Sequence, residues 1–366
     1  MYYRSWCNYF LQVQHGTGNL TGQPVISSSK SEYGRNNALW DTGFHVIGLS
    51  QGGPAALQLA HSQVMEYVHE AKWVGHLPGG MAPSGGGGVQ CPGVLTWAAM
   101  VLFEKTHDLK FLAAVYAVFA SNNAWWYKTY DTDGNGLCEW NGLISGWDNS
   151  PVSHFEHKQS CQHLISSGTS LMGYLCFQRW DTGPVDAVDL NAWLCLDQQT
   201  LAQMAALLGK PQTEVDGWWR QANHTAALMQ NLLYDETSGL FLDWNAKTNK
   251  SVDVVTPATF FVLLPGVATH AQALRMARQL SNRSTLESPF PLPVVSRTDP
   301  TYVPYLYWRG PTWININFLT VVGLKRYGLH TEAERLRRST LALVARGDVL
   351  REYYNSDNGT GLGAEK

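Results

Sequence analysis

The sequence predicts one all-α domain, a ring of helical hairpins with long functional loops gathered at one end. Apolar residues recur at helical spacing over most of the 366 residues, whereas only two short runs favour strands. Long loops rich in Gly, Pro and Trp separate successive helix pairs, and no linker-like break divides the chain. Loops of that length are uncommon in compact domains unless they carry function. We therefore expect residues 1–366 to form a single (α/α) toroid.

Eight segments carry the helical pattern. In the first, Leu57, Val64 and Val68 fall at helical spacings, and a later segment has a wider apolar face that includes Trp193 and Leu201. The predicted helices are residues 55–71, 92–103, 109–127, 188–208, 214–233, 270–280, 312–327 and 331–346. The predicted strands are residues 252–255 and 294–296, and the connecting loops are residues 16–38, 75–93, 129–153 and 288–310.

Composition and charge exclude several classes of protein. With 45% apolar and 15% charged residues, the chain is not expected to be disordered. A net charge of −3 argues against a nucleic-acid partner, and no apolar run reaches the roughly 18 residues of a membrane span. The first ten residues lack the pattern of a secretory signal, so the compartment stays open, as does the oligomeric state.

The loop at residues 129–153 contains a candidate general acid. Asp148 directly follows Gly146 and Trp147. A carboxyl group that is desolvated beside an indole has a raised pKa, which a general acid needs at neutral pH. The alternative is a structural role, in which Asp148 is a turn residue that bonds its own backbone.

A second carboxylate and two further aromatic segments complete a candidate sugar site. Glu352 lies beside two tyrosines before a Gly-rich turn, and paired carboxylates from distant segments are the usual equipment for glycoside hydrolysis. Indole rings suit the apolar face of a sugar, and carboxylates and amides bind its hydroxyls. The aromatic and polar residues of the two further segments are Trp40, Asp41, Phe44, Tyr307, Trp308, Arg309 and Trp313.

The motifs LWDTGFH, SGWDNSP, YWRGPTWININF and EYYNSDNGTGLG resemble glycoside hydrolase family 63 and its mannosylglycerate/glucosylglycerate hydrolase-like relatives, which share a clan with trehalases. The resemblance runs from about residue 30 to the end of the chain. It implies an (α/α)6 toroid and an inverting mechanism, with Asp148 as general acid and Glu352 as general base. Matching positions that line the sugar subsite are Trp40, Asp41, Phe44, Gln90, Trp308 and Trp313, and we expect Gly146, Trp147, Tyr307 and Arg309 in the same pocket.

The resemblance implies a small carbohydrate substrate with an α-glycosidic bond, most simply an α-glucosidic one. Trehalase-like and mannosylglycerate or glucosylglycerate hydrolase activities are the alternatives. The segment VDAVDLNAWL at residues 185–194 stands where glycerate-specific relatives carry an Arg-Pro segment, and it is closer to trehalases. Relatives also continue past the Gly-rich turn with a further helix, whereas this sequence ends 14 residues after Glu352, so we expect a toroid incomplete at its C-terminus.

Two alternatives come from other classes of function. Residues 48–52 match G-x-S-x-G with Ser50 at the centre, the nucleophile motif of serine esterases, which requires a strand before the serine and a helix after it. The chain lacks the alternating strand–helix pattern of such enzymes. The other alternative is a helical carbohydrate-binding relative without activity.

No cofactor is expected, but two segments have metal-ligand chemistry. A cluster of His154, His157, Cys161 and His163 could hold zinc, although polar loop residues are the simpler explanation. Asp131, Asp133 and Asn135 match the start of a calcium loop, whose twelfth position is Gly142 instead of Glu, so only a structural calcium is conceivable there.

The Gly-rich loop at residues 75–93 is expected to border the sugar pocket and to move on ligand binding. Ordering a Gly-rich backbone is entropically costly, which favours a functional lid over simple packing. The alternative is a surface excursion without a role in binding.

Overall fold

The computed structural model describes residues 13–15, 24–26, 37–82, 85–87, 93–140, 142–153, 185–282 and 285–365. The described part of the chain is mostly helical, and its strands are short, with two to five residues each. Within these residues no helix is long and apolar enough to cross a membrane. The chain forms two compact units: unit 1 is Met1–Gly136, Trp193–Ala226 and Ala364–Lys366, and unit 2 is Leu137–Ala192 and Ala227–Gly363.

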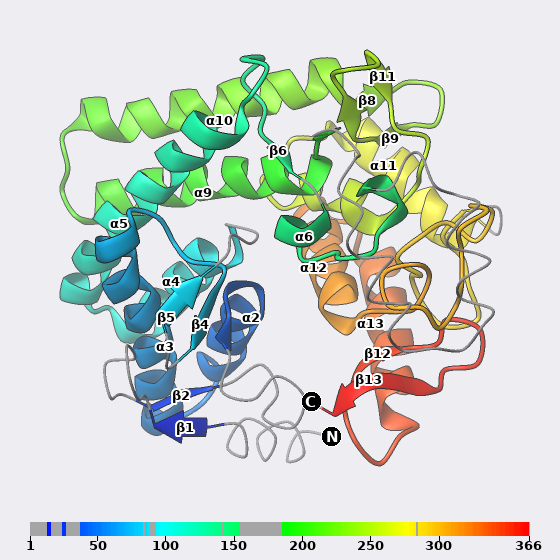
Figure 1. The fold of residues 1–366 in the computed structure, drawn as a ribbon, viewed down its shortest axis with the longest axis horizontal. Helices are drawn as coiled ribbons and strands as arrows, with labels where there is room; N and C mark the ends of the chain where they lie inside the picture. The colour runs from blue at the N-terminus through cyan, green and yellow to red at the C-terminus, as the bar shows by residue number, and fades with distance from the viewer. Residues whose placement is uncertain are drawn as a thin grey trace. The chain divides into compact units, whose positions relative to one another are not determined.

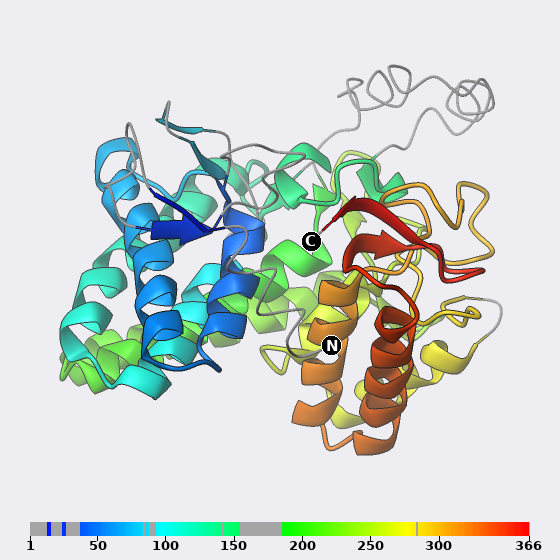
Figure 2. The ribbon, with the colours of Figure 1, turned by 90° about the horizontal axis from the view of Figure 1, so that it is seen from below.

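Unit 1 is a helical layer with two small sheets (Figures 1 and 2). The helices α2 (Leu39–Leu49), α3 (Pro54–Val74), α4 (Gly93–Thr106) and α5 (Leu109–Tyr130) pack side by side. The approach of α2 to α4 requires Gly43, because a Cβ there would lie 2.3 Å from a methyl carbon of Val94. The strands are β1 (Val13–His15) with β2 (Pro24–Ile26), and β3 (Asn37–Ala38) with β4 (Gly80–Ala82) and β5 (Gly85–Gly87).

Unit 2 combines a helical hairpin with several short strands. The hairpin is α12 (Ile314–Arg326) and α13 (His330–Ala345), and the 3-10 helix η2 (Pro257–Leu263) packs on α12. The four-stranded sheet has the order β11 (Lys250–Ser251), β10 (Trp244–Asn245), β7 (Val185–Asp186) and β6 (Glu139–Trp140). The shorter elements are α6 (Gly142–Ser145), η1 (Pro151–Ser153), η3 (Gln279–Ser281) and β12 (Arg351–Tyr354). Strand β12 pairs with β13 (Gly361–Glu365), whose last two residues are assigned to unit 1.

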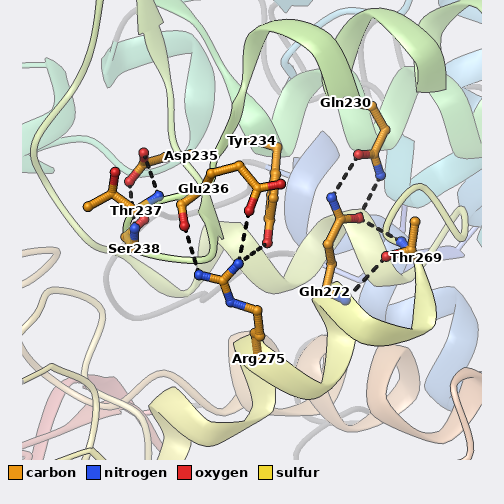
Figure 3. Close-up of polar contacts among 9 residues, drawn as sticks. All are labelled: Gln230, Tyr234, Asp235, Glu236, Thr237, Ser238, Thr269, Gln272 and Arg275. Atoms are coloured by element: carbon orange, nitrogen blue, oxygen red, sulfur yellow. Dashed lines mark hydrogen bonds and ion pairs between the residues drawn. The ribbon is translucent and has the colours of Figure 1, made fainter.

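Side-chain contacts attach α11 (His270–Arg278) to its surroundings in unit 2 (Figure 3). The Arg275 guanidinium donates to the Glu236 carboxylate at 3.0 Å and to the Tyr234 hydroxyl at 3.1 Å, on the hairpin of β8 (Tyr234–Asp235) and β9 (Leu240–Phe241). Thr269 and Gln272 form a capping box at the start of α11. These contacts fix the helix against the hairpin.

Two long helices, α9 (Val188–Leu207) and α10 (Gln212–Leu232), contribute residues to both units. The unit boundary falls after Ala192 in α9 and after Ala226 in α10. The segments of the two units therefore alternate along the chain. That residues 1–366 form a single domain stays a prediction.

The structure confirms all eight predicted helices, with bounds that differ by a few residues, and corrects both predicted strands. Residues 252–255 and 294–296 form no strand. Val252, Val294 and Val295 are fully buried in irregular segments, so their β-branched composition reflects burial in the core. Part of the 75–93 loop forms β4 and β5, and the proposed lid movement stays a prediction.

The structure also argues against the esterase alternative. Ser50 follows the helix α2, whereas a nucleophile elbow requires a strand before the serine. The Ser50 hydroxyl is buried and donates to the Val46 carbonyl at 2.7 Å, which is a local helix-capping contact. Ser50 therefore has neither the exposure nor the strand–turn–helix setting of a nucleophile.

Candidate active site

An aromatic stack in unit 2 joins the segments that carry the two candidate catalytic carboxylates. Trp147 stacks on Trp308 with ring centroids 4.9 Å apart, Trp308 on Trp313 at 3.9 Å, and Trp313 on Tyr353 at 5.1 Å. Asp148 directly follows the first ring of this stack, and Glu352 directly precedes the last. Both carboxylate residues are half-buried. The stack thus links two carboxylate-bearing segments that are far apart in the sequence.

Two hydrogen bonds clamp the loop of Asp148 to the loop of Trp308. The Trp308 amide donates to the side-chain oxygen of Asn149 at 2.8 Å, and Arg309 Nε donates to the Asn149 carbonyl at 2.7 Å. Both partners are buried, so each bond satisfies a group that has no access to solvent. The sequence predicts Arg309 in the sugar pocket, and this contact gives it a structural role, because it fixes the loop that carries Asp148.

Backbone hydrogen bonds connect strand β12 to Thr312, a residue shortly before α12. Thr312 and Tyr354 exchange two backbone hydrogen bonds, at 2.7 and 2.9 Å, which set Tyr353 beside Trp313. Burial and the negative charge of Glu352 raise the pKa of Tyr353 to about 12, so the phenol is protonated at neutral pH. Glu352 lies on the short strand β12, which was not among the predicted strands.

The backbone before Trp308 is strained. Tyr307 has φ of 42°, a left-handed conformation that is unusual for an aromatic residue. Its carbonyl accepts the indole N–H of Trp313 at 2.9 Å. A non-glycine residue in this region costs on the order of 1–3 kcal/mol, and such strain concentrates at functional sites.

The faces of Trp308 are covered by its neighbours. Trp147 and Trp313 stack on it, and only 1% of its surface is exposed. Its indole N–H has no partner among the described residues. In this structure Trp308 therefore offers no free face on which a sugar could stack, and its predicted contact with a sugar stays a prediction. Tyr307 and Tyr353 are the half-buried aromatic rings of this group, and Tyr353 was not among the residues predicted to line the pocket.

A small polar cavity of about 20 Å³ lies beside Trp147, enough to hold a water molecule. Asp189 and Asp243 both line it and both are buried. Burial raises the pKa of Asp243 to about 6, and burial together with the charge of Asp243 raises the pKa of Asp189 well above its usual value. The Ser150 hydroxyl and the Trp147 indole N–H also border the cavity and have no partner among the described residues.

Asp189 and Asp243 were not selected from the sequence, although the principle that pointed to Asp148 applies to them. Both carboxyls are desolvated near an indole, and the cavity contains no basic side chain among its described lining residues. Asp189 lies in the VDLN segment, and Asp243 caps α9 by accepting the Val188 amide at 2.6 Å. Asp243 bonds the Val188 amide, which lies 55 residues earlier in the sequence. No local sequence pattern reveals such a distant contact, so the sequence alone could not identify Asp243.

A second group of predicted residues lies in unit 1, on the first two turns of α2. Trp40 contacts Phe44 and Trp193 edge-to-face, with centroids 5.2 and 6.4 Å apart. Asp41 lies in the first turn, where the helix dipole stabilises a carboxylate. No helix was predicted over these residues, whereas the structure places them on α2.

Several predicted ligands lie outside the described residues or stay untested. Gln90 and the cluster of His154, His157, Cys161 and His163 lie outside the described residues. In the acidic turn, Asp133 accepts from the backbone and side chain of Asn135, and Asp131 accepts from the Gly136 amide at 3.2 Å. These bonds close the turn internally, and calcium binding there stays a prediction.

Several curated proteins are similar to this chain in sequence. The mannosylglycerate hydrolase of Thermus thermophilus is 32% identical over 184 residues, which cover 50% of this chain and 43% of that protein. Mannosylglycerate hydrolase MGH1 of Selaginella moellendorffii is 26% identical over 317 residues, covering 75% and 63%. The chain spans between 41% and 64% of the length of the curated relatives it matches.

Solved structures share the fold. The glycoside hydrolase family 63 mannosylglycerate hydrolase of Thermus thermophilus, crystallised in complex with glucose, matches with a TM-score of 0.81 at 23% identity, covering 99% of this chain and 96% of that one. Neutral trehalase Nth1 of Saccharomyces cerevisiae matches with a TM-score of 0.70 at 19% identity, covering 96% and 74%. These likenesses confirm the predicted fold class, the (α/α)6 toroid.

The family model described as "Mannosylglycerate hydrolase MGH1-like glycoside hydrolase domain" matches residues 34–366, which confirms the resemblance first seen in the motifs. The chain therefore belongs to the mannosylglycerate hydrolase MGH1-like family of glycoside hydrolases.

Proposed function

We propose that the chain is an inverting glycoside hydrolase that cleaves an α-glycosidic bond in a small glycoside, with mannosylglycerate and glucosylglycerate as the first substrates to test. The observation that carries this proposal is the aromatic stack, because its two end rings adjoin the two carboxylates. Family membership supports the class of reaction, and relatives named mannosylglycerate hydrolase support a glycerate-linked substrate.

In the proposed mechanism, Asp148 donates a proton to the glycosidic oxygen. Glu352 takes a proton from a water that attacks the anomeric carbon from the opposite face, so the product has the inverted configuration. We expect the two carboxyl groups to lie about 6.5–9.5 Å apart around bound substrate, since an inverting mechanism needs room for the water. A separation of about 5 Å would indicate a retaining enzyme.

A product-resolved screen tests the substrate class. The panel contains mannosylglycerate, glucosylglycerate, trehalose, kojibiose and nigerose, and proton NMR follows the anomer that forms first. We expect an α-linked substrate to release the β-anomer. Preferred turnover of trehalose would support the trehalase-like alternative, which the likeness to neutral trehalase favours. Binding without turnover of any compound would support the carbohydrate-binding alternative.

Two substrates that differ in the acidity of their leaving group test the role of Asp148. Asp148→Asn should lower kcat on natural glycosides by about 10²–10⁴-fold, because general acid catalysis contributes that much. It should lower kcat far less on a dinitrophenyl glycoside, whose leaving group needs no proton. The matched control is Asp357→Asn, a partly exposed carboxylate paired with Arg297 in the same unit. Equal losses on both substrates would mean that Asp148 is not the acid.

The role of Glu352 is tested by a nucleophile that needs no base. Glu352→Gln should be inactive on natural and activated glycosides alike, since water still has to lose a proton. Azide should restore turnover of the activated substrate and give a β-glycosyl azide from an α-glycoside. An α-configured azide would contradict direct inversion.

A further inference from the structure

A groove of about 580 Å³ lies between α5 and α10 in unit 1, separate from the groups described above. Its volume falls in the range of small-molecule sites, about 300–1,000 Å³. The groove is lined by Tyr116, Ala120, Glu214, Gly217, Trp218, Arg220, Gln221 and His224. All of these residues belong to unit 1.

A chain of hydrogen bonds fixes the aromatic wall of the groove. The Trp218 indole N–H donates to the Tyr116 hydroxyl at 2.9 Å, and that hydroxyl donates to Glu214 Oε1 at 2.5 Å. Burial and the bond to Glu214 raise the pKa of Tyr116 to about 12, which keeps this hydroxyl protonated at working pH. Trp218 is thus held in one orientation while part of its ring stays exposed. An aromatic ring fixed before binding loses little entropy when a ligand stacks on it.

Gly217 opens a hollow in the groove wall where the fold does not require a glycine. It lies inside α10, where glycine is less favourable than alanine. The nearest atom to a Cβ built there is Nη2 of Arg220, at 3.8 Å, so packing would admit a side chain. The backbone is an ordinary helix at this position. A glycine that neither packing nor conformation demands is consistent with space kept for a ligand.

The polar lining is suited to hydroxyl groups. Glu214 uses Oε1 for Tyr116, and no described residue bonds its other carboxylate oxygen. Arg220, Gln221 and His224 present donors and acceptors along the exposed side of α10, without partners among the described residues. The charged groups of the lining, Glu214 and Arg220, have opposite signs, and the Lys210 ammonium lies 5.3 Å from the centroid of the Tyr116 ring. Donors and acceptors beside a stacking ring match the hydroxyl groups and the apolar face of a neutral saccharide.

We propose that the groove between α5 and α10 is an accessory binding site for a neutral saccharide, in which a pyranose ring lies against Trp218 and its hydroxyls bond Glu214, Gln221 and His224. The proposal does not depend on the catalytic roles assigned to Asp148 and Glu352. A chain with no hydrolase activity could still hold sugar here, so the two proposals fail separately.

The test follows the indole N–H resonance of Trp218 in ¹⁵N-labelled full-length chain, assigned with Trp218→Phe. The probes are methyl α-D-mannopyranoside and methyl α-D-glucopyranoside, which are neutral, and methyl α-D-glucuronide, which is anionic. We expect a saturable shift of this resonance with at least one neutral probe. Gly217→Leu fills the hollow and should abolish the shift, while Gly217→Ala should keep the fold with a melting temperature at or above that of the parent.

A matched pair of amide side chains on α10 provides the control. Gln221→Ala, in the groove, should weaken neutral sugar binding about tenfold, which corresponds to one good hydrogen bond to a fixed partner. Asn223→Ala, equally exposed but outside the lining, should leave it unchanged. The absence of a Trp218 shift with both neutral probes would overturn the proposal. Binding of the glucuronide alone, or a shift that survives Gly217→Leu, would overturn it equally.

Discussion

At the scale of single residues, Gly363 limits where the Glu352 carboxylate can lie. Its φ is +68°, and a Cβ built on it would lie 2.6 Å from Oε2 of Glu352 and 2.6 Å from a ring carbon of Tyr353. Gly363→Ala should displace the proposed base, and a misplacement of 1 Å can cost about 10²-fold in rate. We therefore expect a fall in kcat with little change in KM, measured by steady-state kinetics.

Gly359 is the matched control for this substitution. It is also left-handed, with φ of +76°, but a Cβ there would meet Phe290 instead of Glu352. Gly359→Ala should lose a similar amount of stability, on the order of 1–2 kcal/mol for an alanine held in this conformation, without the specific loss in kcat. Equal effects of both variants on kcat would mean that Gly363 acts only through stability.

Asp189 and Asp243 should make the protein less stable as the pH rises. Their pKa values are raised in the folded state, to about 6 for Asp243, so the folded state binds more protons than the unfolded state above about pH 4. The free energy of unfolding therefore falls as the pH rises from about 4 through 6 and beyond. Asp243→Asn keeps an acceptor for the Val188 amide and should flatten this dependence, measured by urea unfolding at a series of pH values.

The contribution of Asp235 to stability should depend on pH in the opposite direction, so Asp235 serves as the internal comparison (Figure 3). Bonds from Ser238 and from nearby amides lower its pKa, so its ionised form is stabilised in the folded state. Asp235→Asn should destabilise the protein at neutral pH, and the difference should vanish as the pH falls below the pKa of the folded state. Parallel slopes for the Asp235 and Asp243 variants would contradict the assigned environments.

At the scale of elements, Asn149 couples the loop of the proposed acid to the loop before α12. Asn149→Ala would leave the buried Trp308 amide without an acceptor, which costs about 1–3 kcal/mol. It should also lower kcat, because Asp148 is the neighbouring residue. Asn149→Asp retains an acceptor oxygen and should recover much of the stability in thermal unfolding. Full activity and stability of Asn149→Ala would show that the Arg309 bond alone holds the loop.

The elements also show which parts of the fold a sequence can predict. The eight helices were predictable because their apolar spacing is local, as in α3 and α9. The strands were missed because they have two to five residues and pair with distant partners, as β7 does with β6 and β10. The aromatic motif at Trp308 gave no sign that neighbouring rings would cover both faces of the Trp308 indole, and the sugar site itself stays a prediction.

At the scale of the whole molecule, the path of the chain predicts how the protein unfolds. Segments of the two units alternate along the sequence. The two unit boundaries near the middle of the chain fall inside the continuous helices α9 and α10. Unfolding one unit alone would have to interrupt both helices, losing backbone hydrogen bonds and exposing buried residues such as Trp193 and Ala222. We therefore expect the two units to unfold together, as the sequence-based prediction of one domain requires.

Scanning calorimetry tests this cooperativity. A single transition with equal calorimetric and van't Hoff enthalpies is the expected result. Hydrogen exchange gives an independent reading, since the slowest amides of α4 in unit 1 and of α12 in unit 2 should open with the same free energy and the same dependence on denaturant. Gly363→Ala, which alters only unit 2 chemistry near Glu352, should shift both sets of amides equally if the units are coupled. Two calorimetric transitions, with protection lost in one unit while the other stays folded, would show that the units are separate domains.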